Sequence, residues 1–145
     1  MDKALSVLLI EDERLILELV REALEEAGFQ VHAMPSGAAA RDWLDCNGAV
    51  MTGLLTDVRL GPGPDGWDLA RHARRLRPDV PVVYMTADSG AHWRAEGVPH
   101  SVLLQKPFAT RQVVIALSAL LNEAEGRVPC HPQHTVASVA VPPAT

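Results

Sequence analysis

The chain has 145 residues, a net charge of −5, and a composition of 48% hydrophobic and 21% charged residues, so its length suits one domain with a substantial core and leaves no room for a second folded output domain. The negative charge gives no electrostatic reason to expect a nucleic-acid partner, because such binding depends largely on Lys and Arg. No apolar run approaches the roughly 20 residues that span a bilayer, so no membrane segment is expected.

The first apolar run, residues 4–10, leads directly into three acidic residues at 11–13. A signal peptide would end in a small-residue cleavage site, so this run predicts a buried strand and a cytoplasmic protein. A helix is predicted over 13–27, because apolar residues recur there at helical spacing. Gly28 follows as the expected C′ residue of that helix.

The rest of the chain alternates apolar runs with segments of helical period. Further strands are predicted at 30–34, 52–56, 81–86 and 101–105, and further helices at 37–46, 66–77, near 89–96 and at 109–124. This alternation is typical of βαβ units with a parallel sheet that helices cover on both faces. Residues 126–145 contain four prolines and no period. We therefore expect a domain over 1–125 and a flexible Pro-rich tail over 126–145.

The basic residues of one helix and the cysteines do not indicate a functional site. A basic run on the helix at 66–77 is interpreted as a solvated helix face; it comprises Arg71, His72, Arg74, Arg75 and Arg77. Cys46 and Cys130 form no metal or redox spacing, and free thiols are expected. His131 and His134 join Cys130 in the tail, but without a second cluster these three residues do not predict a metal site.

Polar residues stand at the ends of four predicted strands. Glu11 and Asp12 follow the first strand, Asp57 follows the third, Thr86 closes the fourth and Lys106 follows the fifth. The carboxyl ends of parallel strands lie at one edge of the sheet, where ligands bind, so these side chains should converge in one cleft. Clustered carboxylates repel one another unless a cation compensates, and three of them predict a hard-oxygen site suited to Mg²⁺.

In this order, the acidic pair, Asp57, Thr86 and the dipeptide Lys106-Pro107 resemble the active site of a response-regulator receiver domain from two-component signalling. The resemblance covers about residues 4–123. It implies a flavodoxin-like (βα)5 fold, a doubly wound five-stranded parallel sheet of order 2-1-3-4-5, whereas the sequence alone leaves several strand orders open. It also implies that Asp57 accepts phosphate from a sensor histidine kinase or a histidine phosphotransfer domain.

The same resemblance implies the metal ligands. Asp12 and Asp57 would bind Mg²⁺ directly, Glu11 would act through water, and the backbone carbonyl of Arg59 would be the third protein ligand. Two plainer alternatives remain open. Asp12 is also placed to cap the following helix, and Asp57 is placed to form a turn before the GPGPDG loop.

The phosphoryl group would meet two further side chains, the compact ammonium of Lys106 and the hydroxyl of Thr86. A surface lysine beside a turn proline is the plainer alternative for Lys106. The sequence departs from the family pattern at Leu103, where many receivers carry an aromatic residue that turns inward with the threonine. Tyr84 is the only tyrosine. We therefore expect the phosphorylation signal to appear as an order or position change in residues 88–100.

The leading interpretation is a stand-alone receiver that acts as a phosphorylation-controlled module or phosphorelay intermediate, with a possible downstream protein partner. It is not a conventional enzyme, because its own residue is consumed and regenerated. One alternative is a Mg²⁺-dependent phosphohydrolase of the haloacid-dehalogenase type, which needs a second acid where this chain has Arg59. Another is a flavodoxin-like domain that binds a nucleotide or flavin, but no Gly-rich loop follows the first strand.

Overall fold

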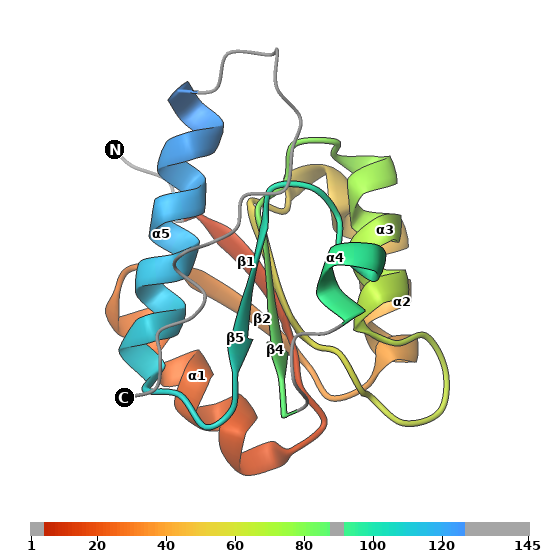
Figure 1. Cartoon of the computed structure of the whole chain (residues 1–145), viewed down its shortest axis with the longest axis horizontal. Coiled ribbons are helices and arrows are strands. Elements are labelled where there is room, and N and C mark those ends of the chain that lie inside the picture. Colours follow the sequence, from red (N-terminus) through yellow and green to blue (C-terminus); the bar gives the residue numbers. More distant parts are fainter. Residues whose placement is uncertain (1–4, 88–91, 127–145) are drawn as a thin grey trace.

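The protein is described by a computed structural model, which covers residues 5–87 and 92–126. Within them lies a five-stranded parallel sheet of order β2-β1-β3-β4-β5 (Figure 1). The strands are β1 (Ser6–Ile10), β2 (Gln30–Met34), β3 (Gly53–Asp57), β4 (Val82–Thr86) and β5 (Ser101–Gln105). The helices are α1 (Arg14–Glu26), α2 (Gly37–Asn47), the 3-10 helix η1 (Gly48–Val50), α3 (Gly66–Leu76), α4 (Trp93–Glu96) and α5 (Thr110–Gly126). The predicted fold class and strand order are confirmed.

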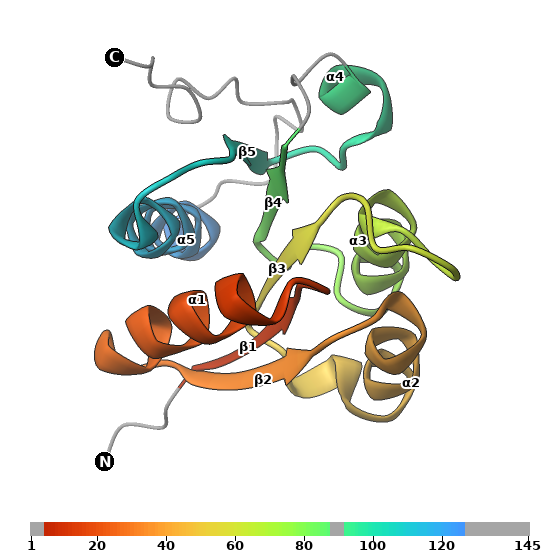
Figure 2. The same cartoon turned by 90° about the horizontal axis from the view of Figure 1, so that it is seen from below.

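Helices cover both faces of the sheet. Seen along the strands, α1 and α5 lie on one face, and α2, α3 and α4 lie on the other (Figure 2). All five residues of β3 and all five of β4 are buried. Burial on both faces explains why these strands read as nearly continuous apolar runs instead of alternating patterns.

Local sequence sets where the helices begin and end. Ser36 caps α2 by accepting a hydrogen bond from the backbone N–H of Ala39 at 3.1 Å. Glu13 is the N-cap residue of α1 and makes no side-chain capping bond, so the alternative that Asp12 caps this helix is wrong. Gly28 follows the last turn with a φ of 100°, a conformation that favours glycine and confirms the predicted C′ residue.

The predicted elements are confirmed with shifts of one or two residues at their ends, apart from the 3-10 helix η1, which the sequence did not predict. Of the short helix predicted near 89–96, Trp93–Glu96 is helical, and residues 88–91 lie outside the described part. α5 continues to Gly126, and the predicted tail lies outside it from residue 127 on. Among the described helices, none has the length and apolar character that crossing a bilayer requires.

The basic run on α3 is more than a solvated face, and that interpretation is wrong in part. The guanidinium of Arg74 donates hydrogen bonds to the carbonyl oxygens of Val80, Pro99 and His100 at 2.7, 2.6 and 3.1 Å. It thereby ties α3 to the segments that lead into β4 and into β5. Sequence periodicity did not distinguish this residue from its neighbours, because the carbonyl groups it binds belong to distant loops.

Candidate functional site

The strand register brings the predicted site residues to one edge of the sheet. Ile10 of β1 pairs with Thr56 of β3, so Glu11 and Asp57 follow side by side at the carboxyl ends of these strands. On the other side of β3, the backbone N–H of Val58 donates to the carbonyl of Met85 at 3.0 Å. The polar residues that close neighbouring strands are thus placed together, as the sequence predicted.

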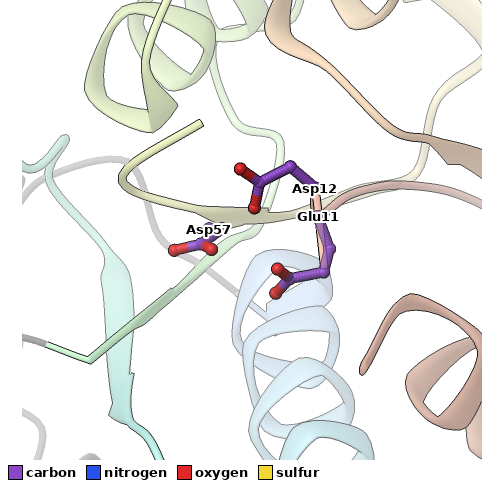
Figure 3. Close-up of side chains that lie close together, drawn as sticks. All are labelled: Glu11, Asp12 and Asp57. Carbon is purple, nitrogen blue, oxygen red and sulfur yellow. The ribbon is translucent and has the colours of Figure 1, made fainter. Parts of the chain in front are cut away.

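Three carboxylates meet at this edge. One carboxylate oxygen from each of Glu11, Asp12 and Asp57 lies within 4.8 Å of the other two. Figure 3 shows the three side chains arranged around a common space. Glu11 is fully buried, Asp57 is 7% exposed, and Asp12 is exposed to solvent. Two buried carboxyl groups therefore adjoin a third that remains accessible to solvent.

Lys106 supplies a positive charge to this cluster. Its Nζ donates to Glu11 Oε1 at 2.9 Å and to Asp57 Oδ2 at 3.1 Å. Burial lowers the pKa of Lys106, but the hydrogen bond to Glu11 and the charge of Asp57 oppose this, and the net result is a raised pKa. Lys106 is therefore a cation held between two carboxylates, and the alternative that it is a free surface lysine is wrong. The bond to Pro107 is cis.

Glu11 has both carboxylate oxygens engaged within the protein. Oε1 accepts from Lys106, and Oε2 accepts from the backbone N–H of Glu13 at 3.0 Å. Burial raises the pKa of Glu11 to about 7, and the charge of Asp57 acts in the same direction, while the hydrogen bonds from Lys106 and Glu13 oppose them. Burial is thus the main reason for the raised pKa of Glu11, and the neighbouring carboxylate of Asp57 adds to it.

Asp57 stands where β3 passes into the loop that leads to α3. A Cβ atom added to Gly66 would lie 2.3 Å from the carbonyl oxygen of Asp57 and 2.8 Å from the Cα of Val58. The N–H of Gly66 donates to the carbonyl of Val58 at 2.8 Å. The start of α3 therefore packs directly on the backbone of Asp57, which a larger residue at position 66 would not allow.

Thr86 and Arg59 are the two remaining predicted site residues. Thr86 is 5% exposed at the end of β4, and its carbonyl accepts a hydrogen bond from the backbone N–H of Lys106 at 2.7 Å. This bond fixes the backbones of two predicted site residues beside each other. Arg59 lies two residues after Asp57 with an exposed side chain. Asp88, also near the site in sequence, lies outside the described residues.

Tyr84 has a role that sequence reasoning did not identify. It pairs with Leu103 of β5 and is fully buried, with its ring 4.7 Å from that of Trp67 between centroids. Its hydroxyl accepts a hydrogen bond from the backbone N–H of Val98 at 3.1 Å. Burial raises the pKa of Tyr84 to about 12, so the hydroxyl stays neutral. In this pair of strands the aromatic ring therefore belongs to β4, and the residue paired with it on β5 is Leu103.

The described part of the predicted signalling segment is anchored to the core. The indole Nε1 of Trp93 donates to Ser101 Oγ at 3.0 Å, and that hydroxyl donates to the carbonyl of Val98 at 2.7 Å. Trp93 is 8% exposed. Its burial makes it a suitable reporter of any movement of α4, while the predicted change itself stays a prediction.

An apolar hollow of about 460 Å³ adjoins Lys106 on the side of α1. Ile16, Leu19 and Val20 of α1 line one side, and Pro107 and Phe108 line the other. Leu19 is 49% exposed, and the neighbouring Leu15 is 72% exposed. An open apolar surface therefore lies directly beside the charged cluster.

Comparisons with known proteins agree with this geometry. A family model described as the response regulator receiver domain matches residues 7–118. The transcriptional regulatory protein GltR of Pseudomonas aeruginosa is 35% identical over 124 residues, which are 83% of this chain and 50% of that protein. For the transcriptional regulatory protein QseB of Escherichia coli O157:H7, the identity is 32% over 123 residues, or 83% of this chain and 55% of that protein. This chain thus spans about half the length of these two regulators.

Solved structures also resemble the chain over most of its length. The crystal structure of a response regulator receiver protein from Sinorhizobium medicae matches with a TM-score of 0.81 and 40% sequence identity. The match covers 84% of this chain and 98% of that protein. The similarity therefore extends beyond the site to most of the fold.

Proposed function

The chain belongs to the response regulator receiver domain family of two-component systems, and we propose that Asp57 is the residue through which it accepts a phosphoryl group. A receiver of this family is a regulator and not a conventional enzyme. One observation carries the assignment: among the three clustered carboxylates, Asp57 alone stands at the end of the central strand β3 and contacts the ammonium of Lys106 at 3.1 Å. Glu11 also contacts Lys106, but it is fully buried with both oxygens occupied.

The proposed transfer step is a displacement at phosphorus. A carboxylate oxygen of Asp57 forms the new P–O bond, the P–N bond to the donor's imidazole breaks, and the electron pair leaves with the imidazole nitrogen. Lys106 places its positive charge where the phosphoryl oxygens of the product would lie, and Thr86 offers a hydroxyl at the neighbouring strand end. The chain would thus use its own residues to promote its phosphorylation.

The carboxylate cluster fits Mg²⁺. Its oxygens are hard ligands, and three carboxyl groups adjoin a single ammonium, that of Lys106. We assign Asp12 and Asp57 as direct ligands, the Arg59 carbonyl as a third, and Glu11 as a ligand through water, in keeping with the engagement of both its oxygens. When bound, the ion would offset the negative charge that an incoming phosphoryl group brings.

The partner we propose is a helical protein that carries the phosphohistidine, either a histidine kinase or a phosphotransfer domain. The apolar hollow beside Lys106 supports this proposal, because the half-exposed Leu19 and the partly buried Phe108 line it and the exposed Leu15 lies beside it on α1. A partner helix that packs there would bring a histidine toward Asp57. The downstream partner of the phosphorylated form is proposed to be a protein.

The test is phosphorylation of the chain by acetyl phosphate or by a phosphorylated histidine kinase, followed by intact-mass measurement. Wild type should gain one phosphoryl group with Mg²⁺ and none in EDTA, and Asp57→Asn should gain none. Asp42→Asn, which changes an exposed aspartate on α2, is the matched control and should behave as wild type. Full labelling of Asp57→Asn would overturn the assignment.

The two alternative functions receive no support from the family match. A haloacid-dehalogenase phosphohydrolase needs an acid two residues after its nucleophile, and the exposed Arg59 stands there. A nucleotide or flavin site on this sheet edge would have to accept phosphate beside Glu11, Asp12 and Asp57, which repel it unless a cation intervenes.

A further inference from the structure

A second hollow, with a polar lining, lies between α2 and α3, which run side by side on one face of the sheet (Figure 2). We call it the arginine hollow. It has a volume of about 370 Å³ and is lined by Arg41, Gly63, Pro64, Asp68, Arg71 and Arg75. This volume falls within the roughly 300–1,000 Å³ that is usual for small-molecule sites. The hollow takes no part in the proposed phosphorylation chemistry.

The three arginines differ in how their charges are balanced. Arg71 contacts two carboxylates, Asp68 Oδ1 at 3.2 Å and Glu96 Oε1 at 3.3 Å. In the part of the chain that the structure describes, neither Arg41 nor Arg75 has a carboxylate partner. Two guanidinium groups from different helices thus reach the hollow without a counterion of their own.

Arg75 is held in place by a chain of side chains between the two helices. The Nε2 of His72 lies 2.7 Å from Asp45 Oδ1, and its Nδ1 lies 3.5 Å from an Nη atom of Arg75. With the ring proton on Nε2, His72 donates to the carboxylate, and its Nδ1 is left to accept from Arg75. Asp45 therefore orients His72, whose Nδ1 faces Arg75 without neutralising its charge.

The loop that closes the hollow packs tightly against α2. A Cβ atom on Gly37 would lie 2.1 Å from the carbonyl oxygen of Pro64, so only glycine at the start of α2 allows this approach. Gly63 has a φ of 97°, which favours glycine and lets the chain turn there. The wall between Arg41 and Arg75 is therefore built by close backbone contact.

We propose that the arginine hollow binds a small molecule that carries two anionic oxygen groups, either phosphates or carboxylates. Arg41 and Arg75 each offer a planar pair of donors that matches one such group. Their origin on separate helices suits a ligand with two charged ends, and the volume suits a small metabolite. This proposal does not depend on phosphorylation of Asp57.

The experiment is a titration of the whole chain with pyrophosphate and, separately, with succinate. Binding is measured by isothermal titration calorimetry and by NMR. Protein and buffer are first passed over a chelating resin, so that no metal-dependent binding occurs at the carboxylate cluster and no soluble chelator competes for the hollow. At least one probe should bind saturably and shift the amide signals of α2, residues 63–64 and α3. Arg41→Gln and Arg75→Gln should each weaken binding by about tenfold or more, as expected when a charge-assisted contact is lost.

Arg111→Gln is the matched control, because Arg111 is exposed on α5, far from the hollow in sequence and on the other face of the sheet. It should keep wild-type affinity. The preferred probe identifies the ligand as a phosphate or a carboxylate compound. The proposal is overturned if neither probe binds saturably. It is also overturned if both arginine variants keep wild-type affinity, or if Arg111→Gln loses as much affinity as they do.

Discussion

The carboxylate cluster and the arginine hollow are two charged regions that share the loop between β3 and α3, yet they differ in how far their charged groups are exposed to solvent. At the cluster, Glu11 and Asp57 are buried and one ammonium serves both. In the hollow, Arg41 and Arg75 are exposed and have no carboxylate partner within the described residues. Buried like charges raise the free energy of the fold, whereas exposed ones are screened by solvent.

The two regions also differ in what fixes the positions of their side chains. The cluster is fixed by strand register, since its residues stand at the ends of paired strands. The hollow is fixed by helix packing, by a Gly-Pro loop and by the Asp45–His72–Arg75 chain. We therefore expect changes at the cluster to alter stability strongly, and changes in the hollow to alter ligand binding with little effect on stability.

The largest effect is expected at Gly66, where the shared loop meets the cluster. Gly66→Ala places a Cβ atom against the backbone of Asp57 and Val58, and the backbone must shift to relieve the contact. We expect the unfolding free energy to fall by about 3 kcal/mol, measured by urea denaturation, and phosphorylation of Asp57 to slow.

Gly28→Ala is the control for this change. Gly28 has a positive φ, but nothing lies within 4 Å of an added Cβ, so the expected loss is only about 1 kcal/mol, from backbone strain. Equal losses in the two variants would show that the close contact at Gly66 adds nothing to the stability of the loop.

The next effect is a pH dependence that comes from Glu11. Its pKa rises from 4.5 to about 7 on folding, so the folded state holds the proton more tightly than the unfolded state. Its contribution to stability is present in full below pH 4.5 and is lost as the pH rises toward 7. In EDTA, wild type should lose about 2–3 kcal/mol from this residue between pH 5 and pH 8.

Glu11→Gln removes this titration and isolates it from the other ionisable groups. Urea denaturation at several pH values should show that the unfolding free energy of the variant increases relative to that of wild type as the pH rises from 4.5 to 7. Parallel curves for the two proteins would mean that Lys106 compensates Glu11 fully, and the comparison between buried and exposed charges would lose its main support.

Most of the fold and of the carboxylate cluster was predictable from the sequence, because both follow from short-range patterns. Apolar runs of about five residues located the strands, and polar residues at their ends located Glu11, Asp57 and Lys106. The strand order came from the family resemblance, because hydrophobic periodicity does not specify which strands are neighbours.

Contacts made by distant side chains were not predictable in this way. The hydroxyl of Tyr84 accepts from the N–H of Val98, and Arg74 donates to carbonyls on two loops. Arg41 and Arg75 line one hollow from two helices. Each contact depends on how helices and loops pack in three dimensions. The one signal available in the sequence was the density of basic residues on α3, which suggested only a solvated face.

A smaller loss of stability is expected at a buried group that carries no charge, and it tests whether burial alone makes a group important for stability. Tyr84→Phe removes a neutral, buried hydroxyl and leaves the N–H of Val98 without its acceptor. We expect thermal and urea denaturation to show a loss of about 1–2 kcal/mol, the usual penalty for an unsatisfied buried donor. An unchanged stability would indicate that water reaches Val98 and that this part of the β4–β5 face is open.

The smallest effect is expected where the charges are exposed. The double variant Arg41→Gln, Arg75→Gln removes two like charges that have no carboxylate partners among the described residues, and the hydrogen bond from Arg75 to His72 is long, at 3.5 Å. The unfolding free energy should therefore stay within about 0.5 kcal/mol of wild type. Any change should be a small gain at low salt that disappears at high salt, because screening removes repulsion between exposed charges. A loss of 2 kcal/mol or more, roughly the penalty for a buried group, would show that the two guanidinium groups hold α2 and α3 together, and that the arginine hollow is a structural joint instead of a ligand site.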